Sequence, residues 1–146
     1  CKNFFISKEV RTLQAVVEPT AIENQNFKVL YIEDVPANVV LVEKIFECRP
    51  NIEIFSAPNA NSGIALARNI LPDLILMDIQ LPDMDGISAL KKLQKINETQ
   101  DIPVIALTAD AMSTDKKKGL EMGFKDYLTK PLDIAQLLDT VDKVLA

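Results

Sequence analysis

The sequence predicts an α/β fold built on an open, doubly wound parallel sheet. From residue 27 onward, short apolar runs alternate with amphipathic stretches, which is the order of strands and covering helices in such folds. Three of the apolar runs are almost continuously hydrophobic, as strands covered on both faces must be. The alternating part is about 120 residues long, which suits an open sheet, whereas a closed α/β barrel needs roughly 250.

Five segments have the composition of strands. In chain order they are Lys28–Ile32, Asn51–Phe55, Asp73–Met77, Ile102–Leu107 and Phe124–Leu128. Because a helical pattern separates each strand from the next, right-handed crossover connections are expected, and these make the strands parallel.

Five helices are expected between and after the strands. Three carry apolar stripes at helical spacing, formed by Val39, Val42, Ile45 and Phe46, by Ile87, Leu90 and Leu93, and by Ile134, Leu137, Leu138, Val141 and Val144. Two weaker patterns lie near Asn59–Asn69 and Ser113–Met122. Pro36 and Asp133 are typical of helix starts, and Gly123 of a helix end.

Residues 1–26 do not follow this alternation. Their apolar residues predict at most a short helix at 7–17, followed by a polar linker. We therefore divide the chain into an N-terminal segment, 1–26, and one domain, 27–146. The first residue is not Met, which suggests a piece of a longer protein.

The charge balance narrows the possible partners. The chain has 16 Lys and Arg against 21 Asp and Glu, a net charge of −5, which disfavours direct binding to nucleic acid or to an anionic membrane. No apolar run approaches the roughly 18 residues of a membrane span, and the first apolar cluster, Phe4, Phe5 and Ile6, is shorter than a secretory signal requires. These features predict a cytoplasmic location. The chain has no histidine, so it cannot supply a phosphohistidine of its own.

Polar residues gather where the predicted strands end. Glu33 and Asp34 follow the first strand, Asp78 the third, Thr108 the fourth and Lys130 the fifth. Ligands of doubly wound sheets bind beyond the carboxyl ends of the strands, so these side chains should lie together. The sequence thus predicts one site assembled from residues far apart in the chain.

The chemistry of that set points to a metal and a phosphoryl group. Three carboxylates in contact repel one another by about 4 kcal/mol per pair at 4 Å and an effective dielectric of 20. A hard cation such as Mg²⁺, for which Mn²⁺ could substitute, offsets this repulsion. With Lys130 and Thr108 nearby, the space beyond Asp78 would suit phosphoryl transfer, with Asp78 as the nucleophile.

From Lys28 to Ala146 the chain resembles the response-regulator receiver domains of two-component signalling. The segments that carry the resemblance are VLYIEDVPAN, LPDLILMDIQLPDMDG, IPVIALTAD and GFKDYLTKP. The sequences of these segments are most similar to those of receivers attached to hybrid sensor histidine kinases. The resemblance implies a flavodoxin-like fold with strand order 2-1-3-4-5 and five helices.

The resemblance also implies roles at the site. Asp78 would accept the phosphoryl group, and Glu33, Asp34, Asp78 and the backbone carbonyl of Gln80 would hold Mg²⁺. Glu33 stands where Asp is commoner, a longer arm that could hold the metal through water. Thr108 and Lys130 would bind the phosphoryl oxygens. The family also leads us to expect a cis bond between Lys130 and Pro131.

Four residues would act around the phosphoryl group as a switch or as regulators of its lifetime. Thr108 and Tyr127 are the expected switch pair, in which the Tyr127 ring follows the Thr108 hydroxyl inward and reshapes the neighbouring surface. Gln80 and Asp110 should flank the path of a hydrolytic water and tune the phosphoryl lifetime.

The predicted function is therefore a phosphoacceptor switch rather than a metabolic enzyme. Its phosphoryl donor would be a histidine kinase or a histidine phosphotransfer domain. The alternatives are a pseudo-receiver that only binds a partner, and a metal-dependent phosphatase or nuclease of similar topology. Asp83 and Asp85 look like a second metal motif, but we interpret them as turn and helix-cap residues, with Gly86 relieving the turn.

Overall fold

The sheet has five parallel strands in the order β2-β1-β3-β4-β5, as the resemblance implies. The computed structural model describes residues 25–109 and 113–146, so the N-terminal segment up to residue 24 and Asp110 lie outside the described residues. The elements are β1 Phe27–Ile32, α2 Pro36–Ile45, a 3₁₀ turn Phe46–Cys48, β2 Ile52–Ala57, α3 Ala60–Ile70, β3 Leu74–Asp78, α4 Gly86–Lys95, β4 Val104–Thr108, α5 Ser113–Met122, β5 Asp126–Thr129 and α6 Ile134–Leu145.

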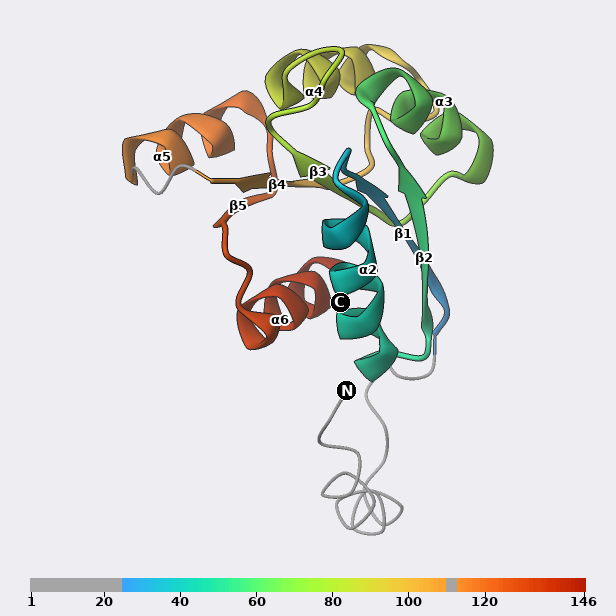
Figure 1. Ribbon diagram of the computed structural model, residues 1–146. Coiled ribbons are helices and arrows are strands. Elements are labelled where there is room, and N and C mark those ends of the chain that lie inside the picture. The colour runs from blue at the N-terminus through green and yellow to red at the C-terminus, as the bar shows by residue number, and fades with distance from the viewer. Residues whose placement is uncertain (1–24, 110–112) are drawn as a thin grey trace, which may run out of the picture.

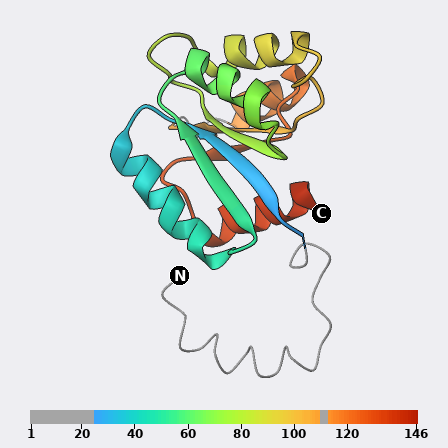
Figure 2. The same ribbon diagram turned by 90° about the vertical axis from the view of Figure 1, so that its right-hand side faces the viewer.

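Helices cover both faces of the sheet (Figures 1 and 2). Helices α2 and α6 pack on one face, and α3 and α4 on the other, with α5 beside β5. Successive strand residues point to opposite faces, so in β1 Val29 and Tyr31 enter the first core layer while Leu30 and Ile32 enter the second. Every residue of β3 and β4 is buried, which is why these segments are apolar up to their last residues, Asp78 and Thr108.

The ends of the helices follow the local signals in the sequence. Pro36 begins α2, and the side chain of Asp133 accepts a hydrogen bond from the amide of Gln136 at the start of α6. Asn59 caps α3 in the same way. Gly123 follows α5 with φ of 117°, the left-handed conformation that favours glycine.

The last two strands begin two residues later than predicted. Ile102 and Pro103 precede β4 because the amide of Ile102 closes a turn onto the Thr99 carbonyl and proline has no amide to donate. Phe124 precedes β5 because its amide bonds the Gly119 carbonyl and so completes the end of α5. The shift does not alter which edge of the sheet carries the polar residues.

Candidate functional site

Three carboxylates meet at the carboxyl edge of the sheet. Glu33, Asp34 and Asp78 each offer one oxygen, and these oxygens lie within 4.8 Å of one another. Asp78 is the last residue of β3, while Glu33 directly follows the neighbouring strand β1. Glu33 and Asp78 are 1% and 6% exposed, whereas Asp34 faces solvent. The cluster is therefore buried on one side and open on the other.

The ammonium of Lys130 lies between the two buried carboxylates. Its Nζ donates to Asp78 Oδ2 at 2.7 Å and to Glu33 Oε1 at 3.0 Å. The Lys130 amide bonds the Thr108 carbonyl at 2.7 Å, which continues the β4–β5 pairing one residue further. The bond between Lys130 and Pro131 is cis, as expected. Lys130 thus follows β5 and reaches across β4 to the ends of β3 and β1.

Asp78 is held through both of its oxygens. Oδ1 accepts from the amide of Gln80 at 2.9 Å, and Oδ2 accepts from Lys130. The segment beyond Asp78 folds back on itself, since the Gly86 amide bonds the Ile79 carbonyl at 2.8 Å and Gln80 pairs with Asp85. A Cβ on Gly86 would lie 2.9 Å from the Ile79 Cα, so this return needs glycine.

Glu33 accepts hydrogen bonds from four groups. Oε1 accepts hydrogen bonds from the Lys130 ammonium, from the Asn38 side-chain amide at 2.6 Å and from the Tyr31 hydroxyl at 3.3 Å. Oε2 receives the backbone amide of Asp34 at 3.1 Å. Sequence reasoning did not single out Tyr31 or Asn38. The available signals were that Tyr31 lies two residues before Glu33, on the same face of the strand, and that Asn38 lies in the first turn of the next helix.

The pKa values of the two buried carboxyls move apart. Burial raises the pKa of Asp78, and the neighbouring Glu33 raises it further, against the opposing contacts of Lys130 and Gln80. Burial also raises the pKa of Glu33, but hydrogen bonds from the Asp78 carboxyl when it is protonated, from Asn38 and from Lys130 outweigh it and bring the pKa to about 2. Asp78 is consequently the carboxyl of this pair that takes up a proton first.

Thr108 and Tyr127 lie on adjacent strands. Thr108, 3% exposed, ends β4, and the half-buried Tyr127 lies in β5 opposite Ala106. The Tyr127 ring contacts Phe124 edge to face, with centroids 6.3 Å apart. It also fills the space that Gly119 of α5 leaves free, because a Cβ there would lie 2.5 Å from the ring carbon Cδ2. In this structure the ring packs against α5.

Asp83 and Asp85 cap helices, although not the same one. Asp85 accepts from the Ser88 amide at 2.7 Å and so caps α4. Asp83 accepts from the amides of Ala60 and Asn61 at 2.9 and 2.8 Å, at the start of α3. The cap interpretation holds for both residues, but the helix that Asp83 caps is distant in sequence.

The cluster offers the ligand atoms that a hard divalent cation prefers. Its ligands are all carboxylate oxygens, which suit Mg²⁺ or Mn²⁺. Three carboxylates against the single ammonium of Lys130 leave two negative charges, which one divalent ion balances. The residues present therefore fit the metal.

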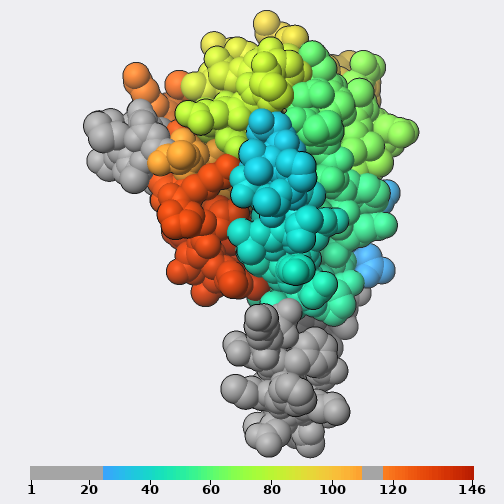
Figure 3. Space-filling model, in the orientation of Figure 1, coloured from blue at the N-terminus to red at the C-terminus, as the bar shows by residue number. Residues whose placement is uncertain are grey.

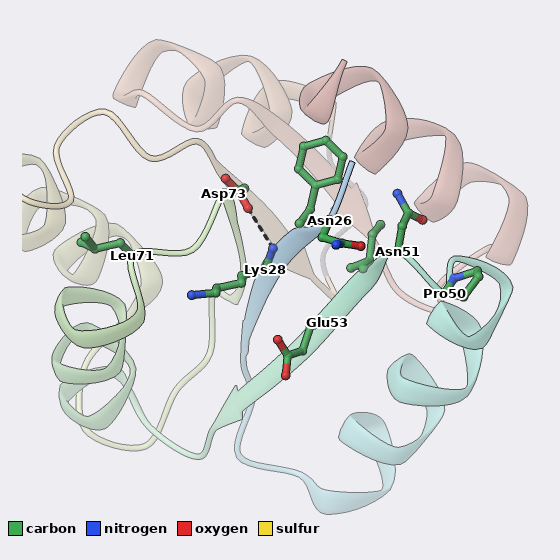
Figure 4. Close-up of a pocket in the computed structure, with 9 residues that line it drawn as sticks. Asn26, Lys28, Pro50, Asn51, Glu53, Leu71 and Asp73 are labelled. Carbon is green, nitrogen blue, oxygen red and sulfur yellow. Dashed lines mark hydrogen bonds between the residues drawn. The ribbon is translucent and has the colours of Figure 1, made fainter. Parts of the chain in front are cut away.

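A cavity of about 630 Å³ lies at the opposite edge of the sheet (Figure 4). It is lined at the amino ends of β1 and β2, where the Lys28 amide donates to Asp73 at 2.8 Å. Lys28 and Glu53 carry opposite charges on paired positions of β1 and β2. No residue of the acidic cluster lines this cavity, so we do not assign it to the site.

Comparisons with known proteins agree with this geometry. The family model of the response regulator receiver domain matches residues 29–142. Protein PilH of Pseudomonas aeruginosa is 40% identical over 119 residues, which cover 82% of this chain and 98% of PilH. The signal transduction histidine-protein kinase BarA of Escherichia coli K12 is 39% identical over 110 residues, 75% of this chain but 12% of BarA.

Solved structures show the same fold. The receiver domain of Francisella response regulator 1452 has a TM-score of 0.75 at 34% identity, covering 82% of this chain and 97% of that one. The receiver domain of sensor histidine kinase PA1611 from Pseudomonas aeruginosa has a TM-score of 0.73 at 29% identity, covering 82% and 98%. The PA1611 structure contains a magnesium ion coordinated in the active-site cleft.

Proposed function

The chain belongs to the response regulator receiver family of two-component signalling, and we propose that it is a switch operated by phosphorylation of Asp78. The observation that carries the proposal is the placement of Asp78: a buried carboxylate at the end of β3, beside two further acids and in contact with an ammonium. We assign the receiver domain to residues 27–146 and a linker to 1–26.

The transfer itself would be a displacement at phosphorus. An Asp78 oxygen forms the new O–P bond while the N–P bond of the donor's phosphohistidine breaks, and the freed imidazole takes up a proton. Lys130, already 2.7 Å from Asp78, follows the negative charge onto a phosphoryl oxygen. Mg²⁺ bound by Glu33, Asp34, Asp78 and the Gln80 carbonyl would supply electrostatic stabilisation of the transferred group.

Thr108 would couple the arrival of the phosphoryl group to a change in conformation. Its hydroxyl would bind a phosphoryl oxygen, and the Tyr127 ring would leave its place against Gly119 to follow. Gln80 and Asp110 would set the lifetime of the acyl phosphate through access of water, although Asp110 lies outside the described residues.

The donor must be another molecule or another domain, because this chain has no histidine. We propose a histidine kinase or a histidine phosphotransfer domain in the cytoplasm, and a hybrid histidine kinase as the parent protein, in line with the similarity to the BarA segment. No described helix is long and apolar enough to cross a membrane.

The surface beside the acids suits a protein donor. Helices α2 and α6 both begin at this edge and lie next to each other on the face shown in Figure 3. Val35, which precedes α2, and Val40, Leu41 and Ile134 within the two helices expose apolar side chains. A donor that brings its histidine to Asp78 would cover this surface.

Intact mass after incubation with Mg²⁺ and acetyl phosphate tests the proposal. We expect a gain of one phosphoryl group, lost without Mg²⁺ and lost in Asp78→Asn. Asp83→Asn is the matched control, because it changes a carboxylate in the following loop that caps α3 instead. No gain together with no binding of beryllofluoride would indicate a pseudo-receiver, and repeated turnover of a phosphate ester would indicate an enzyme.

A further inference from the structure

The two oxygens of the Glu33 carboxylate are used very differently. Oε1 accepts from three side chains, those of Lys130, Asn38 and Tyr31, whereas among the hydrogen bonds described above for residues 25–109 and 113–146 Oε2 accepts one, from the backbone amide of Asp34. The Glu33 side chain is fully buried. One oxygen is thus saturated by the protein, while the other keeps capacity for a further ligand.

Tyr31 and Asn38 reach Glu33 from within the fold. Tyr31 is 0% exposed and belongs to the core layer between the sheet and helices α2 and α6. Asn38 is half-buried in the first turn of α2, and its contact of 2.6 Å is the shortest that Glu33 makes among the hydrogen bonds given above. Neither residue has a part in the phosphoryl transfer described so far. Both are neutral donors, so they hold a carboxylate without cancelling its charge.

We propose that Asn38 and Tyr31 are positioning residues for Glu33. They hold Oε1 against the interior, which directs Oε2 toward the metal, and they keep Oε1 hydrogen-bonded when Lys130 turns to the phosphoryl group. This inference rests on the proposed function, because it assigns a part to residues that support the same metal and the same lysine.

The physical reason lies in the cost of a buried carboxylate without donors. If Lys130 were the only side chain on Oε1, its departure would leave a buried charged oxygen unsatisfied, which disfavours the departure. With Asn38 and Tyr31 in place, Glu33 retains two side-chain donors and the Asp34 amide. The lysine can then be shared between Asp78 and the incoming phosphoryl group.

The test compares Asn38→Ala and Tyr31→Phe with the wild type. Asn69→Ala is the matched control, since Asn69 is an exposed asparagine on helix α3. The first measurement is the dissociation constant for Mg²⁺ of the unphosphorylated protein by calorimetric titration. Loss of a group that orients a metal ligand typically weakens metal binding about 10-fold or more, so we expect about 10-fold for Asn38→Ala. We expect about 3-fold for Tyr31→Phe, whose hydrogen bond is longer.

The second measurement is the rate of labelling by acetyl phosphate as a function of Mg²⁺. A purely structural role would change only the free energy of unfolding in urea, and at saturating Mg²⁺ it would leave the maximal rate unaltered. A positioning role raises the Mg²⁺ concentration at half-maximal rate and also lowers the maximal rate, because Lys130 leaves Glu33 less readily.

The outcomes separate the two proposals. Folded Asn38→Ala and Tyr31→Phe proteins with the wild-type Mg²⁺ affinity and maximal rate would overturn this inference, while normal labelling of the wild type would leave the proposed function intact. A wild type that neither binds Mg²⁺ nor takes a phosphoryl group would overturn both. If Asn38→Ala does not fold, Tyr31→Phe, which removes one hydroxyl, decides alone.

Discussion

Replacement of Lys130 by methionine should strongly destabilise the metal-free protein. The side chain keeps a similar length, but the ammonium that contacts Asp78 at 2.7 Å and Glu33 at 3.0 Å is lost. Each contact corresponds to about 6 kcal/mol of gross attraction at an effective dielectric of 20. Most of this is offset by the desolvation of the charges, and breaking a buried pair from one side costs about 3–5 kcal/mol.

The destabilisation should depend on pH. Without the ammonium, two buried carboxylates face each other, so the pKa of at least one lies above its value in the unfolded chain. The folded variant then binds more protons than the unfolded one, and its stability falls as pH rises. The loss of unfolding free energy relative to the wild type should therefore be largest near about pH 8 and become smaller toward about pH 5. In the wild type, the low pKa of Glu33 acts in the opposite direction, and its stabilisation disappears as pH falls from 4.5 toward about 2.

Urea denaturation in EDTA at both pH values measures this effect. Lys143→Met is the matched control, because Lys143 pairs with Asp139 on the surface, where its side chain is 77% exposed. Its loss should cost less than about 0.5 kcal/mol. A cost of Lys130→Met below about 1 kcal/mol, or one equal at both pH values, would refute the view that this ammonium holds the two carboxylates together.

Three further changes test other parts of the structure. Gly119→Ala should lower the free energy of unfolding by about 1–3 kcal/mol despite the better helix propensity of alanine, because its Cβ would lie 2.5 Å from the Tyr127 ring. A higher free energy of unfolding in urea denaturation would contradict this packing. Leu71→Gly should raise stability by up to about 1 kcal/mol in a thermal melt, since Leu71 is 53% exposed at φ 48°, and a loss would show that its side chain packs. Val40→Ala and Ile134→Ala, which truncate exposed side chains, should slow transfer from a histidine phosphotransfer domain by about threefold or more and leave labelling by acetyl phosphate unaltered; equal effects on both reactions would argue against a docking surface.

The architecture follows from local features of the chain. Strands such as β3 and β4, buried on both faces, must be continuously apolar, and the helices between them must carry one apolar stripe. Helix ends depend on single residues that act on their immediate neighbours, as Asp133 and Gly123 do. The prediction was wrong by two residues at the starts of β4 and β5, where turn hydrogen bonds of Ile102 and Phe124 compete with pairing in the sheet.

The position of the acids was also predictable, for a topological reason. Parallel strands all end at one edge, so residues that follow strands, such as Glu33, Asp78 and Lys130, are brought together whatever the details of packing. That argument places side chains in the same region. It does not say which atoms touch.

The order of residues along the chain thus determines which elements form, how they are layered and which edge carries charge, because these depend on short-range periodicity and on connectivity. Only the tertiary structure decides that Asn38 and Tyr31 share one oxygen of Glu33 with Lys130, and that Asp83 caps a helix that precedes it in the chain. These contacts depend on how far α2 is rotated about its axis and on how the loop after β3 returns. Both are set by packing between segments distant in sequence, and hydrogen bonds that require separations of about 3 Å cannot be derived from spacing alone.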